Sequence, residues 1–181
     1  MPVLCLTPFT QTPLTQDLTL KASLQRIADT LEVSFECCGK LNSLKIAQGS
    51  KSPKRAGELW KATCFEAFFA PSGSLLGPYW ELNLSPSGDW NLYQFDDYRK
   101  GMREAQEIQS LKTFLRSQNE NQLTLKIELK AEFLPETVAA SLTAVLEHTD
   151  GTLSYWALHH PASKPDFHHR EGFVVDLPKS R

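Results

Sequence analysis

The stretch WKATCFEAFFAPSGSLLGPYWELNLSPSGDWNLYQFDDYRKG, residues 60–101, decides the fold. It holds three of the four tryptophans and three of the four tyrosines, and polar residues alternate with apolar ones through its middle. Such period-two alternation in aromatic-rich sequence is typical of β-strands, and clusters of Pro, Ser and Gly are typical of turns. The stretch therefore predicts three successive strands, at residues 63–69, 79–84 and 90–95, with turns at 71–73 and 85–88.

The flanking sequence predicts further strands. Residues 30–37 and 121–130 alternate cleanly between apolar and polar side chains, which indicates half-buried strands. Asp150-Gly151 predicts a tight turn between strands at 141–148 and 153–158. Shorter strands are expected in the first half of 17–28 and at 172–177, with a further short one an option at 44–46.

One segment has helical spacing. Residues 97–117 carry apolar side chains mostly three or four positions apart, so they predict either a short helix or a long loop with one helical turn. A one-turn helix is expected at 134–137, and residues 1–16 are expected to form an irregular lead-in. Many short strands and one short helix predict an all-β protein, an antiparallel β-sandwich in a single domain over residues 1–181.

Composition excludes several classes of function. The net charge of −2, without a dominant basic run, predicts neither nucleic-acid nor anionic-membrane binding. No run approaches the roughly 18 apolar residues that span a bilayer, and the first residues lack the pattern of an export signal. The four cysteines are therefore expected to be reduced thiols in a cytoplasmic protein.

Alternation also sorts the side chains of the three central strands onto faces. If these strands pair as hairpins, Glu66, Glu81, Asn83 and Tyr93 converge on one face. Carboxylates and amides beside aromatic rings suit a saccharide, since rings stack on a pyranose while polar groups bond its hydroxyls. Alternatively, this face is merely the solvated side of the sandwich, and Trp60, Trp80 and Trp156 are core residues.

The motifs of this region carry a resemblance. The segments CFEAF (64–68), YWELNLSPSGDW (79–90), YQFDDYRKGM (93–102) and SYWALHHPASKPDFH (154–168) resemble DOMON-like domains, which are related to family 9 carbohydrate-binding modules. The resemblance implies a jelly-roll-like sandwich of ligand-binding type, with sugars or haem as ligands. It matches Glu66 to the acidic strand motif of the modules and Trp60 to the aromatic residue before it, whereas Ala62-Thr63 stands where the modules often have two Asp.

Other chemistries were weighed against saccharide binding. Glu66 and Glu81 could act as the carboxylate pair of a glycoside hydrolase-like enzyme. His159, His160, His168 and His169 with Asp166 have the composition of a zinc site but not its usual spacing, and Met102 is a candidate haem ligand. A purely structural or protein-binding domain is the last alternative.

The sequence thus predicts a non-catalytic protein that binds a small polar ligand, most simply a saccharide or glycoconjugate, without cofactor or metal. The predicted ligand-binding residues are Trp60, Glu66, Tyr79, Glu81, Asn83, Tyr93, Arg99, Trp156, His159 and His168.

Overall fold

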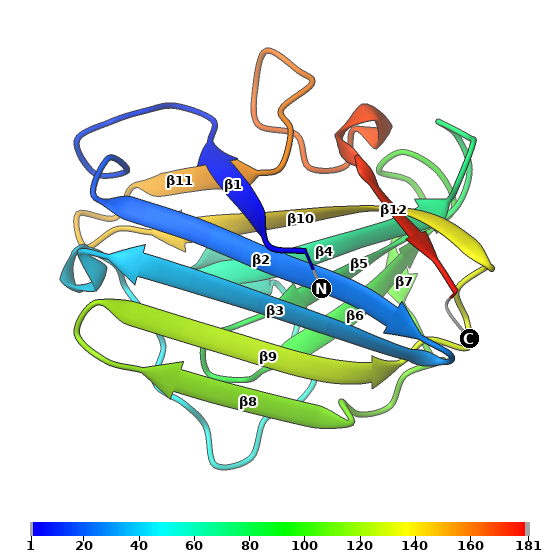
Figure 1. Ribbon diagram of the computed structural model, residues 1–181, viewed down its shortest axis with the longest axis horizontal. Helices are drawn as coiled ribbons and strands as arrows, with labels where there is room; N and C mark the ends of the chain where they lie inside the picture. The colour runs from blue at the N-terminus through cyan, green and yellow to red at the C-terminus, as the bar shows by residue number, and fades with distance from the viewer. Residues whose placement is uncertain (1, 180–181) are drawn as a thin grey trace.

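The computed structural model describes residues 2–179; the remaining residues of the predicted domain, 1 and 180–181, lie outside this range. The twelve strands in the described range join in one hydrogen-bonded path, β7-β6-β5-β4-β10-β11-β1-β2-β3-β9-β8, with β12 paired to β10. The path curls into two layers: β2, β3, β9 and β8 lie in front in Figure 1, and β10, β4, β5, β6 and β7 lie behind them. Every strand pair is antiparallel, so the predicted β-sandwich is confirmed.

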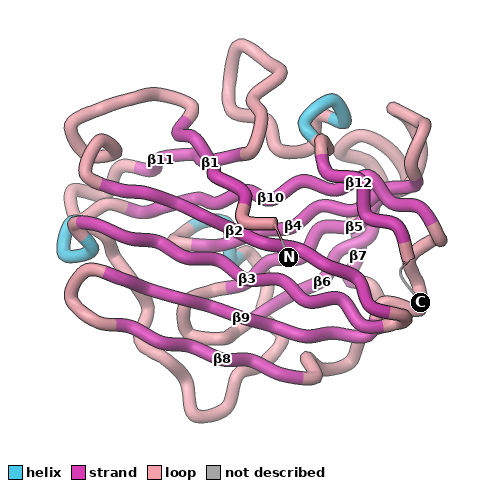
Figure 2. Tube along the Cα trace, viewed as in Figure 1, coloured by secondary structure: helices cyan, strands magenta, loops and turns pink. Residues whose placement is uncertain are grey.

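The front layer consists of β2 (Leu18–Ile27), β3 (Thr30–Gly39), β9 (Gln122–Lys130) and β8 (Thr113–Gln118). The back layer consists of β4 (Cys64–Pro71), β5 (Tyr79–Leu84), β6 (Trp90–Phe95), β7 (Arg103–Glu104), β10 (Thr137–Glu147), β11 (Leu153–Ala157) and β12 (Val175–Pro178). Three 3-10 turns, η1 (Leu41–Ser43), η2 (Leu59–Lys61) and η3 (Arg170–Gly172), account for the helical segments in Figure 2. None of the helices within residues 2–179 is long and apolar enough to cross a bilayer.

The core fills the space between the layers. In the front layer β3 and β9 alternate strictly between buried and half-buried side chains, because one face meets the core and the other meets water. Phe35 of β3 meets Phe65 of β4 across the core, with ring centroids 5.2 Å apart. The strands β4 and β5 are buried on both faces, so their outer face is covered as well. That second, covered face holds the candidate site.

The N-terminal segment differs from the irregular lead-in that was predicted. Residues Leu4–Pro8 form β1, which pairs through Leu4–Leu6 with β2 and through Thr7 and Pro8 with β11. A strand that changes partners along its length joins the two layers of a sandwich at a corner. The sequence gives no clear strand pattern here, because the segment is rich in Pro and Thr and its apolar pattern is short. Only Leu6 of β1 is fully buried.

The helix expected within 97–117 is absent, and this prediction is wrong. Arg103–Glu104 forms β7 and Thr113–Gln118 forms β8, which pairs with β9 from Thr113↔Glu128 to Gln118↔Leu123. Of the apolar residues with helical spacing, Ala105 and Ile108 are buried while Met102 and Leu115 are exposed. A continuous helix would leave the edge of β9 unpaired, so the long-range pairing outweighed the weak local periodicity.

Several boundaries also differ from the predictions. The first strand of the front layer extends through Ile27 rather than ending midway in 17–28. The one-turn helix expected at 134–137 is absent: residues 134–136 are irregular chain, and β10 starts at Thr137. The optional strand at 44–46 reduces to a single bridge between Leu44 and His148, and β12 begins only at Val175, after η3.

Candidate functional site

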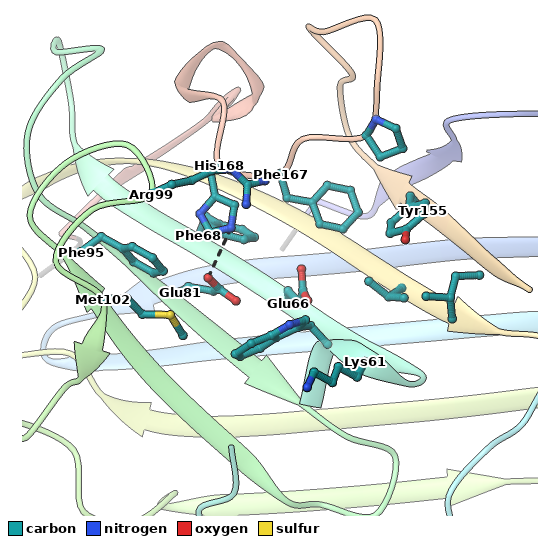
Figure 3. Close-up of a pocket in the computed structure, with 14 residues that line it drawn as sticks. Lys61, Glu66, Phe68, Glu81, Phe95, Arg99, Met102, Tyr155, Phe167 and His168 are labelled. Atoms are coloured by element: carbon teal, nitrogen blue, oxygen red, sulfur yellow. Dashed lines mark ion pairs between the residues drawn. The ribbon is translucent and has the colours of Figure 1, made fainter. Parts of the chain in front are cut away.

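A cavity of about 520 Å³ lies over the outer face of the back layer (Figure 3). Its floor is formed by side chains of β4, β5, β6, β10 and β11, namely Glu66, Phe68, Glu81, Phe95, Val145, Leu153 and Tyr155. Its walls come from η2, the β6–β7 loop and the segment before η3, which contribute Trp60, Lys61, Arg99, Met102, Pro165, Phe167 and His168. The volume falls within the range of about 300–1,000 Å³ usual for small-molecule sites.

Strand register brings the two carboxyl groups to the floor. In the β4–β5 pair Glu66 lies opposite Asn83, and Phe68 lies opposite Glu81. The two glutamates are therefore diagonal neighbours on one face, a relation that places Cα atoms roughly 7–8 Å apart in antiparallel sheets. Alternation alone predicted this shared face, and the pairing confirms it.

Two loops with unusual backbone hold the walls. Glu58, which precedes η2, has φ 57°, and Arg99 in the β6–β7 loop has φ 54°; both lie in the left-handed region that few non-glycine residues occupy. The first conformation sets Trp60 edge-on against Tyr93, with ring centroids 5.6 Å apart. The second lets the backbone N–H of Arg99 donate to the hydroxyl of Tyr79 at 3.1 Å.

Burial governs the protonation of both glutamates. Glu66 accepts a hydrogen bond from Thr143 Oγ1 at 3.0 Å, yet desolvation and the charge of Glu81 raise its pKa well above the usual range. Desolvation also raises the pKa of Glu81 to about 7, although Asn83 Nδ2 donates to its Oε1 at 2.7 Å. Near neutral pH the floor therefore retains at least one carboxyl proton, and it can both donate and accept hydrogen bonds.

His168 faces Glu81 from the wall. Its Nε2 lies 3.8 Å from Glu81 Oε2, and its Nδ1 is 2.8 Å from the Tyr79 hydroxyl. Desolvation, aided by the charge of Arg99, lowers the pKa of His168 to about 4, so the ring is neutral at physiological pH. The Tyr79 hydroxyl also accepts from Arg99 N–H, so it links the imidazole of His168 to the β6–β7 loop.

Asp166 fixes the rim. It accepts from Tyr98 Oη at 2.5 Å, from Arg99 at 2.9 Å and from the backbone N–H of His168 at 3.2 Å. Although burial opposes ionisation, these hydrogen bonds lower the pKa of Asp166. This network ties the β6–β7 loop to the segment that carries His168.

The ten sequence-predicted residues fall into three groups. Five line the cavity, namely Trp60, Glu66, Glu81, Arg99 and His168. Three lie directly behind them: Tyr79 holds His168, Asn83 holds Glu81, and Tyr93 supports Trp60. The remaining two lie elsewhere.

Trp156 and His159 are the two residues that the structure does not bring to the cavity. Trp156 is buried between the two layers, where its Nε1 donates to Ser154 Oγ at 3.0 Å. It points into the core because period two directs its neighbour Tyr155 to the outer face, opposite Val145. His159 is exposed in the loop that follows β11.

Nine of the lining residues are not among the ligand-binding residues that the sequence predicts. Phe68, Phe95, Val145, Leu153 and Tyr155 could have been found, because alternation places them on the same outer face as the predicted residues. Lys61, Met102, Pro165 and Phe167 lie outside the strands, so strand alternation does not place them on this face.

The metal and haem alternatives find little support in the geometry. Within residues 2–179, no group of three or more His, Cys, Asp and Glu side chains is close enough to hold a metal ion. Of the histidine cluster, His168 lies in the cavity wall, whereas His160 packs on Phe9 and bonds the carbonyl of Thr7. Met102 is 45% exposed at the rim.

Neither a protein-family model nor a curated protein sequence matches the chain. Solved structures with similar folds include a putative carbohydrate-binding protein from Bacteroides uniformis, with a TM-score of 0.63 and 13% identity over 98% of this chain and 87% of that one. They also include a family 9 carbohydrate-binding module from Caldicellulosiruptor kristjanssonii in complex with glucose, with a TM-score of 0.56 and 10% identity over 92% of this chain and 80% of that one. The chain thus has the sandwich fold of carbohydrate-binding modules.

Proposed function

We propose that this protein is a non-catalytic carbohydrate-binding module whose site is the cavity over β4 and β5. One observation carries the proposal: the cavity joins aromatic rings, at Trp60, Phe95, Tyr155 and Phe167, to two buried carboxyl groups and a rim guanidinium. Apolar C–H faces of a sugar ring suit the aromatic side chains, and sugar hydroxyls can serve as both donors and acceptors to the floor.

The state of the floor favours a neutral polyhydroxylated ligand. A cationic ligand would favour two ionised carboxylates, whereas burial raises the pKa of both Glu66 and Glu81. An anionic ligand would need a free cation, yet Arg99 is already paired with Asp166, and Lys61 lies 2.6 Å from Glu58. Hydroxyl groups need neither two ionised carboxylates nor a free cation. They can donate a hydrogen bond to an ionised carboxyl group and accept one from a protonated carboxyl group at the same time.

The fold adds independent support. Two proteins with the same sandwich are described as carbohydrate-binding, one of them in complex with glucose. The proposal includes a distant relationship with DOMON-like domains, which rests on the motifs of residues 64–102 and 154–168.

A thermal-shift screen against mono- and oligosaccharides tests the proposal. A ligand that binds only the native state stabilises it by about 2.7 kcal/mol at a hundredfold excess over its dissociation constant. We expect a saccharide to raise the melting temperature of the wild type, and this shift to be lost in Glu81→Ala and Trp60→Ala.

The matched controls are Glu36→Ala, which removes a half-exposed carboxylate of the front layer, and Leu115→Ala, which removes an exposed apolar side chain of β8. Both controls should retain the shift. If no saccharide shifts the wild type, or if the cavity variants respond as the controls do, the proposal is wrong.

A glycoside hydrolase-like activity is the second candidate, because two carboxyl groups with raised pKa values share the floor. Incubation of the wild type with a panel of glycosides decides between the two. Turnover that is abolished in both Glu66→Gln and Glu81→Gln would establish the enzyme, and the absence of turnover on a saccharide that binds would leave the binding module.

A further inference from the structure

A second hollow of about 570 Å³ adjoins the first cavity. It lies between the loop that follows β1, at Phe9–Thr15, and the turn that joins β10 to β11. Leu153, Tyr155 and Pro165 line both hollows, so these three side chains form the partition between them. The two spaces therefore adjoin each other at β11.

The lining of the second hollow combines apolar side chains with hydroxyl groups. Six of its residues carry a hydroxyl: Thr10, Thr12, Thr15, Thr152, Ser154 and Tyr155. Thr12 and Thr15 bond each other, and Thr152 donates to Asp150 Oδ1, which keeps these side chains in fixed positions. A bonded hydroxyl still has an unused lone pair, so it can accept from a further donor.

His148 also lies in this wall. The residue is 1% exposed, its Nε2 is 2.8 Å from Ser154 Oγ, and its Nδ1 has no hydrogen-bond partner. The ring of His148 therefore holds the Ser154 hydroxyl in place at the edge of the hollow.

We propose that the two hollows are adjacent subsites for one oligosaccharide, so that the ligand class is a chain of at least two sugar units rather than a monosaccharide. This inference rests on the proposed carbohydrate binding and extends it. One unit occupies the cavity over Glu66 and Glu81, the chain passes over Tyr155, and the next unit lies against the threonines. The Tyr155 ring, which packs edge-on against Phe167 at 6.1 Å, is shared by both units.

Titration calorimetry with a chain-length series tests the inference. The probes are glucose, galactose, mannose, xylose and N-acetylglucosamine. Each monosaccharide is compared with its own di- and trisaccharides, which are β-1,4-linked, α-1,4-linked or joined by another natural linkage. We expect at least one series in which the disaccharide binds at least tenfold more tightly than its monosaccharide.

A filled second hollow should remove that gain. Thr10→Trp places a large side chain at an exposed position of the second hollow and leaves the first cavity intact. Its matched control is Thr19→Trp, at an exposed position of β2 outside both hollows. The variant should bind the monosaccharide as the wild type does but show no gain with chain length, and the control should show the full gain.

The outcomes separate this inference from the proposed function. If no sugar of any length binds, carbohydrate binding itself is wrong, and the inference falls with it. If sugars bind but chain length brings no gain, or if the gain survives in Thr10→Trp, the protein binds a saccharide in the first cavity alone and the second subsite is wrong.

Discussion

Glu81 Oε2, on the floor of the cavity, lies 3.8 Å from Nε2 of His168 in the wall, and burial shifts the two pKa values in opposite directions. The pKa of Glu81 rises to about 7 and that of His168 falls to about 4, both mainly through desolvation. Both groups are therefore held toward their neutral forms. A floor with a neutral imidazole and a carboxyl group that keeps its proton near pH 7 is suited to hydroxyl recognition.

These opposite shifts predict a compensated pH dependence of stability. Below its unfolded pKa of about 6.5, His168 binds more protons in the unfolded state, so its contribution to stability rises as pH increases from 4 to 6.5. Glu81 binds more protons in the folded state, so its contribution falls as pH increases from 4.5 to 7. Each shift corresponds to about 3 kcal/mol, and the two nearly cancel.

Single variants separate the two contributions. Relative to the wild type, Glu81→Gln should gain stability as pH rises from 4.5 to 7, and His168→Gln should lose it over 4 to 6.5. Urea denaturation at closely spaced pH values measures both slopes. Parallel curves for the wild type and both variants would contradict the assignment.

The hydrogen bond between Thr143 and Glu66 is expected to contribute measurably to stability. Thr143→Val keeps the shape of the side chain but removes the only hydroxyl that donates to Glu66 Oε2 among the described hydrogen bonds. An unsatisfied buried carboxyl should cost about 1–3 kcal/mol in the free energy of unfolding. The control is Thr113→Val, which removes a partly buried hydrogen bond of 3.5 Å to Glu128. The free energy of unfolding is expected to change by less than about 0.5 kcal/mol in this variant.

Gly39 is expected to tolerate no side chain at the end of β3. It has φ 118°, and a Cβ atom there would lie 1.9 Å from the backbone oxygen of Asp17. Gly39→Ala should therefore lower the free energy of unfolding by several kcal/mol. Gly73→Ala is the control, since Gly73 has φ 83° with no atom within 4 Å of its Cβ position, and the backbone penalty alone should cost about 1–2 kcal/mol. Equal losses in the two variants would show that the close approach to Asp17 is unimportant.

The sequence predicted the β-sandwich and the common face of the three central strands because both depend on period-two alternation. Alternation located Glu66 and Glu81, and the β4–β5 register confirms them as neighbours on one face. Trp60, in η2, was selected through the resemblance to carbohydrate-binding modules. The same rule would have selected Tyr155 instead of Trp156, since Tyr155 lies opposite Val145 and Trp156 points inward.

Other features depend on contacts distant in sequence, which alternation does not report. The polar residues on the outer face of β4 and β5 are also compatible with a solvent-exposed face in the sequence. In the structure Phe167, His168 and Phe173 cover this face. Residues 97–117 have weak helical spacing, which predicts a helix or a loop there, whereas pairing with β9 makes β8 a strand. The second hollow lies between the loop at 9–15 and the β10–β11 turn, which are more than 130 residues apart in the sequence. No local sequence pattern therefore predicts it.

A crystal structure of the protein with the saccharide that raises its melting temperature most tests the central claim directly. The account predicts a sugar ring in the cavity over β4 and β5, against Trp60 and with a hydroxyl group within about 3 Å of a Glu81 carboxyl oxygen. A sugar bound on another surface, with only water over Glu66 and Glu81, would contradict it.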